Sequence, residues 1–142
     1  MRALVVVPKA LDEDLDEAER LSVNEYGVLM FLSESEDRQL RLGDLADRMT
    51  LTLSGITRLV TRLATDGLVE RRRCQDDGRG FYAVLTPEGQ DRLERAYPAH
   101  LASARRRVLD HLEGFDLEAL AEAFLRFGGD GSRWPEREER TR

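Results

Sequence analysis

Residues 43–63 constrain the fold of this chain more than any other stretch, because two helical patterns meet there across a short break. In the first pattern, Leu45, Ala46 and Met49 fall on one face of a helix. The pattern stops after Met49. Thr52 is then a good N-cap for a second helix, because its hydroxyl can accept a hydrogen bond from an otherwise unpaired amide. The stretch therefore predicts two helices joined by a tight turn.

The second helix has two chemically different faces. Its apolar residues recur at three- and four-residue spacing and are expected to face the core: Ile56, Leu59, Val60 and Leu63. Its outer face carries small hydroxyl side chains and two arginines: Ser54, Thr57, Arg58, Thr61, Arg62 and Thr65. A helix must lie deep in a groove about 12 Å wide to touch base edges, so small polar side chains suit the DNA major groove. An ordinary solvated helix is the alternative, but such faces usually mix Glu and Lys with Arg.

A basic hairpin pattern follows this helix. Gly67 is placed to end the helix. Two strand patterns and the turn-rich loop between them come next, at residues 68–74, 81–86 and 75–80. Side chains alternate across a strand, so Arg71 and Arg73 share one face and Arg72 takes the other. A helix–turn–helix followed at once by a basic hairpin is the pattern of a winged helix.

In these residues the chain resembles the MarR family of bacterial transcription regulators. The resemblance runs from about Leu21 to Gly89, and five segments carry it in the family's order and spacing: Leu45–Arg48, Thr57–Leu63, Gly67–Arg71, Asp77–Gly80 and Leu85–Gly89. It implies a mainly α fold with a small β-hairpin wing, in which helices that flank the winged helix-turn-helix form a homodimer. It also implies a sequence-specific regulator of transcription that binds an inverted repeat in double-stranded DNA. The expected role is repression, relieved by a small phenolic or aromatic effector.

The resemblance extends to the hairpin tip. Arg79 matches the family arginine that enters the minor groove, where a guanidinium is drawn to the negative potential of a narrow groove. Asp77 is expected to orient an arginine by a bidentate pair. The predicted DNA-binding residues are Thr52, Ser54, Gly55, Thr57, Arg58, Thr61, Arg62, Arg71, Arg73, Asp77 and Arg79.

Three regions are expected. Residues 1–20 and 87–128 form a helical dimerisation region, residues 21–86 the winged helix-turn-helix, and residues 129–142 a charged flexible tail. The dimerisation residues are predicted from apolar stripes at both ends of the chain: Leu4, Val7, Leu11, Leu101, Val108, Leu112, Leu117, Leu120 and Phe124. For the first stripe, which contains Pro8 and continues to Leu15, packing on the chain's own core is an equally good interpretation. Pro8 is expected to bend or start that helix.

Capping signals predict where the remaining helices begin. Ser22 and Glu25 form a capping box before an apolar helix expected to be central. Residues 39–42 are expected to form a short strand beside the wing, after which Gly43 stands at a cap position. Thr86 caps a helix that has Pro87 in its first turn and runs to Leu112. Asp116 caps the last helix.

The charge distribution is consistent with DNA binding despite a net charge of −6 for the 142 residues. Residues 48–82 contain seven arginines against four acidic residues, a local net charge of +3, so the other 107 residues carry −9. Acidic groups farther than about 10 Å from the phosphates are largely screened in salt. A protein that is acidic overall can therefore bind DNA through a basic region such as residues 48–82.

Other functional classes have little support in the sequence. No apolar run reaches the length of a membrane span or a signal sequence. Cys74 is the single cysteine and forms no internal disulfide, which agrees with an expected location in the reducing cytoplasm. Cys74 has no resolving cysteine for a redox switch. His100 and His111 lack companions for a metal site. The resemblance implies that His100 lines a ligand cavity, but an ordinary histidine on the helix surface or in the core is the favoured alternative. No catalytic residues, cofactor or metal site are predicted, so an enzyme is not expected.

One rival interpretation belongs to another functional class. The same fold could serve as a winged-helix dimer that acts mainly in protein contacts and binds DNA weakly. The negative total charge favours this alternative. The acid-free outer face of the second helix, together with Arg79, favours DNA more strongly.

Overall fold

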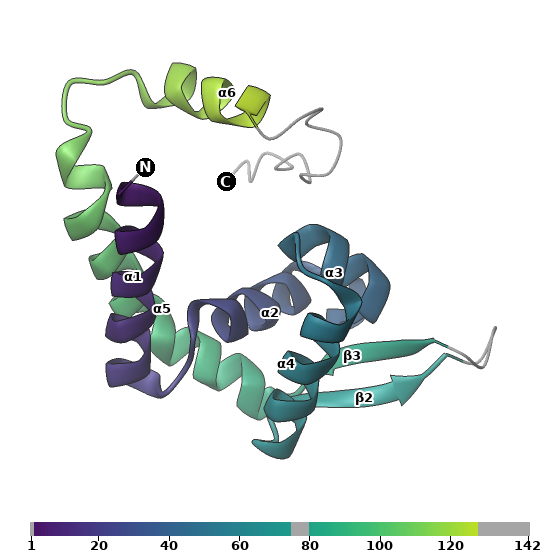
Figure 1. Cartoon of the computed structure of the whole chain (residues 1–142). Coiled ribbons are helices and arrows are strands. Elements are labelled where there is room, and N and C mark those ends of the chain that lie inside the picture. Colours follow the sequence, from purple (N-terminus) through teal and green to yellow (C-terminus); the bar gives the residue numbers. More distant parts are fainter. Residues whose placement is uncertain (1, 75–79, 128–142) are drawn as a thin grey trace, which may run out of the picture. The chain divides into compact units, whose positions relative to one another are not determined.

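The computed structural model describes residues 2–74 and 80–127, with only the backbone for residues 3, 4, 125 and 127 (Figure 1). Its helices and strands are α1 (Ala3–Glu19), α2 (Val23–Glu34), β1 (Gln39–Arg41), α3 (Leu42–Met49), α4 (Leu53–Thr65), β2 (Val69–Arg73), β3 (Phe81–Leu85), α5 (Pro87–Arg107) and α6 (Leu117–Phe127), with short 3-10 turns at Glu36–Arg38 and Leu109–His111. The chain divides into two compact units, Met1–His111 and Leu112–Arg142, which are described separately. None of the helices in the described part is long and apolar enough to cross a membrane.

Helix α2 lies at the centre of the first unit. Its residues Val28, Leu29 and Leu32 are fully buried, and helices α1, α3, α4 and α5 all contact it. The core continues into α4 through Ile56 and Val60, which are also fully buried. The predictions of a central second helix and of an inward-facing apolar stripe on α4 are confirmed.

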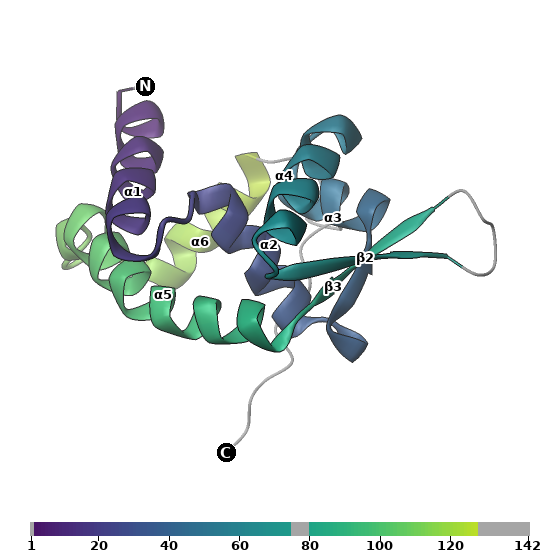
Figure 2. The same ribbon diagram turned by 90° about the horizontal axis from the view of Figure 1, so that it is seen from below.

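The small sheet is antiparallel and has the strand order β1-β3-β2. β2 and β3 pair from Val69 opposite Leu85 to Arg73 opposite Phe81, and β1 pairs along the other edge of β3. Figure 2 shows β2 and β3 running side by side and extending past the helices of the first unit as a wing. The predicted winged helix-turn-helix is confirmed.

The residues predicted to cap helix α4, Thr52 and Gly67, lie at its two ends. The Thr52 hydroxyl accepts from the Gly55 amide at 3.1 Å. At the other end Gly67 has a φ of +74°, and the amides of Gly67 and Leu68 donate back to carbonyls of the last turn at 3.1 and 2.9 Å. This pair of bonds is a Schellman motif, in which glycine adopts the left-handed conformation without a Cβ clash. The chain therefore leaves α4 in the direction that starts β2.

Three other predicted caps are also present. Glu25 and Ser22 form both bonds of the capping box at the start of α2. The Thr86 hydroxyl accepts from the Gly89 amide at 3.0 Å at the start of α5. In the second unit, the Asp116 carboxylate accepts from the amides of Glu118 and Ala119 at 3.0 and 3.1 Å and so begins α6.

Two local predictions are wrong, and one of the two outcomes predicted for Pro8 is excluded. Gly43 does not cap α3, because the buried Leu42 already belongs to that helix and Arg41 occupies the N-cap position with extended backbone angles. Of the two outcomes predicted for Pro8, a bend or a helix start, the start is excluded, because α1 begins at Ala3 and continues through Pro8. α5 ends at Arg107 rather than continuing to Leu112, because Val108 has a φ of −131°, outside the helical range.

Helix α1 is attached to α5 by two clusters of ionic contacts. Near the end of α1, Glu19 pairs with Arg92 at 3.5 Å and with Arg95 at 3.3 Å. In the middle of α1, the Asp14 carboxylate accepts hydrogen bonds from Ser103, Arg106 and Arg107. Leu15, beside Asp14, is fully buried in the core. This part of the N-terminal stripe therefore packs on the chain's own core, one of the two interpretations left open by the sequence.

Candidate nucleic-acid interface

The outer face of α4 is exposed, and no acidic residue occurs within the helix. Ser54, Arg58, Thr61, Arg62 and Thr65 are exposed, whereas Thr57 is half-buried at the edge of this face. Leu59, predicted to face inward, is half-buried against the core. The predicted division of α4 into a core face and an outer face is therefore present in the structure.

The threonine hydroxyls on this face bond to the helix itself. Thr57 donates to the Leu53 carbonyl at 2.7 Å, Thr61 to the Thr57 carbonyl at 2.7 Å, and Thr65 to the Thr61 carbonyl at 3.0 Å. With the hydroxyl protons occupied, these side chains offer outward a methyl group and an oxygen that can accept. Such groups match a thymine methyl and the amino donors of adenine or cytosine in the major groove.

The first turn of α4 is compact and polar. Besides capping the helix, the Thr52 hydroxyl lies 3.1 Å from the Ser54 hydroxyl. A Cβ at Gly55 would meet the Thr52 hydroxyl oxygen at 3.2 Å, which is a tight contact, so glycine leaves room for the capping bond. The N-terminal end of the helix is thus free of bulky polar side chains and could approach base edges.

The two arginines of α4 have different environments. Arg58 is exposed and has no ion-pair partner among the residues that the structure describes. The Nε of Arg62 instead lies 2.9 Å from an oxygen of Glu25, whose side chain is only 2% exposed. The sequence analysis identified Glu25 only as half of a capping box. It did not predict the contact with Arg62, because no local sequence pattern links a residue of α2 to a residue of α4.

The wing has two chemically different faces. Arg71 and Arg73 lie over the ring of Phe81, with guanidinium carbons 4.6 and 5.8 Å from its centroid. Arg72 is on the other face, where it pairs with Glu70 at 3.4 Å. The prediction that Arg71 and Arg73 share a face is confirmed. The predicted tip residues Asp77 and Arg79 lie outside the described residues.

The side chains predicted for dimerisation are only partly buried within their own chain. In the first unit Val7, Leu11 and Val108 are half-buried and Leu101 is 40% exposed, whereas the side chain of Leu4 lies outside the described part. In the second unit Leu112 and Leu120 are half-buried, and Leu117 and Phe124 are 51% and 59% exposed. Two valines that were not predicted, Val5 and Val6 of α1, are also exposed, at 70% and 51%.

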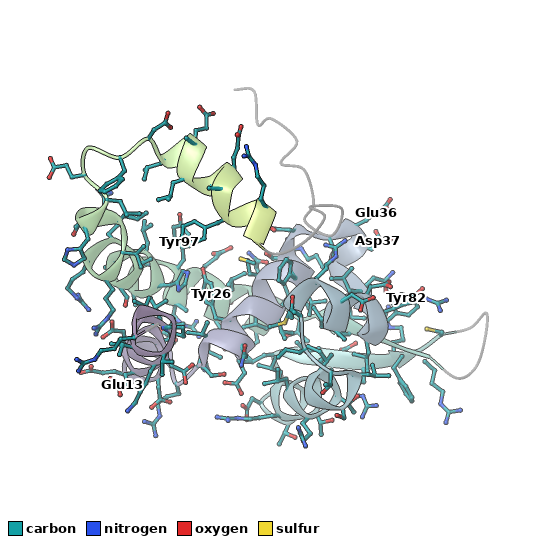
Figure 3. The ribbon with its side chains drawn as sticks, turned by 45° about the horizontal axis from the view of Figure 1, so that its top comes forward. Glu13, Tyr26, Glu36, Asp37, Tyr82 and Tyr97 are labelled. Atoms are coloured by element: carbon teal, nitrogen blue, oxygen red, sulfur yellow. The ribbon has the colours of Figure 1, made fainter. Side chains whose placement is uncertain are left out.

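An aromatic pair lies between α2 and α5. Tyr26 stacks on His100 with ring centroids 4.4 Å apart, and burial lowers the pKa of His100 and raises that of Tyr26. Nδ1 of His100 is buried without a hydrogen-bond partner among the described residues. Figure 3 labels Tyr26 and also Tyr97, which lies on the turn of α5 before His100. The side chain of Tyr97 is 54% exposed.

Cys74 follows β2 and is buried at 3% exposure. The described residues contain no group of three or more side chains arranged to hold a metal ion.

Comparison with known proteins places these features in a family. The family model of the MarR family matches residues 21–80. A solved structure of Sco3205, a MarR family transcriptional regulator from Streptomyces coelicolor in complex with DNA, is 33% identical, covers 96% of this chain and 88% of that chain, and has a TM-score of 0.85. This chain belongs to the MarR family. Its mainly helical fold with a three-stranded antiparallel sheet is the winged helix of MarR structures.

Two other comparisons give proteins with stated roles or ligands. The HTH-type transcriptional repressor YetL of Bacillus subtilis is 39% identical over 82 residues, which are 58% of this chain and 49% of YetL. The match therefore spans about half the length of that curated relative. A structure of CouR from Rhodococcus jostii, bound to p-coumaroyl-CoA, is 25% identical with a TM-score of 0.72 and covers 97% of this chain and 91% of that chain.

Proposed function

We propose that this MarR-family protein is a sequence-specific regulator of transcription that binds double-stranded DNA in the cytoplasm. The observation that carries the proposal is the exposed, acid-free outer face of α4, with Arg58 at its centre, in a helix-turn-helix like that of the DNA-bound Sco3205. Arg58 can donate two hydrogen bonds to guanine, and the threonine methyls and oxygens can contact the neighbouring bases. The arginines of the wing would add contacts to phosphates or to the minor groove.

The protein would act as a homodimer. Exposed apolar side chains on α1 and α6, among them Val5 and Leu117, are surfaces that a second copy could cover. A two-fold dimer presents two copies of α4. It should therefore prefer an inverted repeat whose half-sites are centred about one helical turn, roughly 34–36 Å, apart.

Repression, relieved by a small effector, is the regulatory mode that the relatives favour. YetL is a transcriptional repressor, and CouR is seen with p-coumaroyl-CoA, a thioester of a phenolic acid. An effector releases DNA only if it binds one shape of the dimer more tightly than the other. We infer an effector of phenolic or aromatic character for this protein.

The test is selection of duplexes from a random pool by the purified protein, followed by titration of the selected sequence and of a random duplex. An inverted repeat should be enriched. Arg58→Ala should weaken binding to the selected duplex by about 1–3 kcal/mol and relax the preference at one position in each half-site. Arg20→Ala, at the exposed end of α1, is the matched control and should leave binding unchanged.

The rival function, a winged-helix dimer that contacts mainly proteins, is favoured by the net charge of −6. The same titration separates the two. Weak binding that is equal for selected and random duplexes would support the rival and contradict sequence-specific regulation.

A further inference from the structure

The carboxylate of Glu25 is buried where α2 begins, and it binds in two directions. Its Oε2 accepts a hydrogen bond from the Ser22 amide at 2.8 Å, which completes the capping box, and a second one from the Ser22 hydroxyl at 2.7 Å. Its Oε1 lies 2.9 Å from Nε of Arg62 on α4. One side chain thus joins the first turn of α2 to the outer face of the helix proposed to read DNA.

The two partners differ in exposure. The side chain of Glu25 is 2% exposed, whereas that of Arg62 is 65% exposed. Arg62 is the only basic side chain paired with Glu25 among the described residues. A buried carboxylate without a partner is costly, so the guanidinium is held at Glu25 much more firmly than in a pair between two exposed side chains.

The start of α2 is itself anchored. The amide of Val23 donates to the Asp12 carboxylate of α1 at 2.7 Å, and Leu21 beside it is only 2% exposed. An arginine of α4 that is held at this point therefore restrains the rotation and tilt of α4 against a fixed part of the core. Arg58, one turn earlier on the same helix, has no such restraint among the described contacts.

We propose that Arg62 is a positioning residue for DNA recognition, held by Glu25 so that α4 is presented in one orientation, and that Glu25 thereby withholds this cation from the phosphates. The inference rests on the proposed DNA-binding function and refines it. The sequence alone predicts Arg62 as a DNA contact equivalent to Arg58. The structure assigns the two arginines different tasks.

The experiment compares wild type, Glu25→Gln, Arg62→Ala and the double variant, with Arg58→Ala as the matched control on the same helix. Each protein is titrated with the selected duplex and a random duplex at several salt concentrations. Glu25→Gln keeps the shape of the side chain but removes its charge, so it frees Arg62 for phosphates. Random DNA should then bind severalfold more tightly, with a salt dependence steeper by about one unit for each bound subunit, and the specificity ratio should fall.

Arg62→Ala should lower the specificity ratio without changing the salt slope, because wild-type Arg62 makes no phosphate contact. In the Arg62→Ala background, Glu25→Gln should no longer steepen the slope. Arg62→Lys should restore part of the specificity ratio, since it retains a cation for Glu25 but lacks the planar guanidinium. A purely structural role would change stability but leave the salt slope of Glu25→Gln unaltered.

Unfolding by urea without DNA provides the second measurement. The loss of stability caused by Arg62→Ala should be clearly smaller when Glu25 is already Gln, because the two residues are coupled. Additive losses, or a salt slope that Arg62→Ala flattens equally in both Glu25 backgrounds, would overturn the inference. Failure of the proposed function looks different: wild type would then bind the selected and the random duplex equally weakly at every salt concentration, and the inference, which rests on that function, would fail with it.

Discussion

At the scale of single residues, Gly89 marks a close approach of α5 to the segment that leads into β2. It lies in the first turn of α5, where a Cβ would clash with the Leu68 carbonyl oxygen and lie 2.8 Å from Cδ1 of Leu85. Neither the backbone oxygen nor a core side chain can move aside easily. Gly89→Ala should therefore lower the free energy of unfolding by about 1–3 kcal/mol or more, as measured by urea denaturation.

Gly43→Ala is the matched control for that substitution. Gly43 lies within α3, and a Cβ there would have no neighbour within 4 Å. Alanine in this helix should be neutral or stabilise the protein by about 0.5–1 kcal/mol. Equal effects at the two glycines would show that the close approach of α5 to Leu68 is absent in solution.

The burial of His100 predicts that the free energy of unfolding depends on pH. Burial lowers its pKa below the ordinary 6.5, so the folded protein favours the neutral ring more than the unfolded chain does. The resulting stability is present above the unfolded pKa and is lost as the pH falls through 6.5 toward the lower folded value. His100→Gln should flatten the decline in the free energy of unfolding between about pH 7 and pH 5. The exposed His111→Gln serves as the control, and an unchanged pH profile in His100→Gln would contradict the prediction.

At the scale of elements, the attachment of α1 to α5 depends on Asp14. Hydrogen bonds from Arg107 and Ser103, reinforced by the charges of Arg107 and Arg106, hold the pKa of Asp14 well below its ordinary 3.8. A lowered folded pKa means that the contact stabilises the protein above pH 3.8 and is lost as the pH falls further. Asp14→Asn should therefore lower Tm at neutral pH and reduce the sensitivity of Tm to acid below about pH 4.

Asp16→Asn is the matched control on the same helix. Asp16 is exposed, and its one ionic partner among the described residues is Arg20, at 3.7 Å, in a surface contact that contributes little to stability. Its substitution should change Tm much less than Asp14→Asn does. If both variants lose the same amount of stability, the Asp14 cluster does not hold α1 to α5.

The two faces of β2 lead to a prediction for the wing. Arg73 lies over Phe81 on one face, while Arg72 pairs with Glu70 on the other. If Arg73 contacts only phosphate, Arg73→Ala should weaken binding to all duplexes alike and flatten the salt dependence by about one unit for each bound subunit. Arg72→Ala should have a smaller effect, since its charge is already paired. The reverse order in a salt titration would place the opposite face of the wing against DNA.

At the scale of the whole molecule, the homodimer is the main prediction. Val5 of α1 and Leu117 of α6 are 70% and 51% exposed, which is unfavourable for apolar side chains that remain in water. The protein should sediment as a dimer at micromolar concentration. Because neither side chain is buried within its own chain, Val5→Glu and Leu117→Glu should shift the protein toward monomer without unfolding it.

Leu53→Glu is the control for the dimer. Leu53 is 56% exposed at the start of α4, outside the region predicted to dimerise, and its substitution should leave the sedimentation coefficient unchanged. A wild-type protein that sediments as a stable monomer would contradict the dimer and, with it, the preference for an inverted repeat.

The amino-acid sequence determined the features that depend on neighbouring residues. Apolar spacing predicted the inner face of α4, and Thr52, Thr86 and Asp116 predicted where three helices begin. Caps and helical periodicity act within a few residues, so they can be read directly from the chain. The alternation of side chains along a strand likewise placed Arg71 and Arg73 on one face of β2 and Arg72 on the other.

Only the tertiary structure decided the features that join distant segments. Leu15 lies in the core, Gly89 lies against Leu68, and Glu25 holds Arg62, but the sequence around each residue is compatible with other partners. Glu25 already had a complete local role in its capping box, so no unsatisfied group pointed to α4. Such contacts form only when packing brings two elements together and excludes water. In that setting a buried charge needs a partner, and a close backbone approach leaves no room for a Cβ.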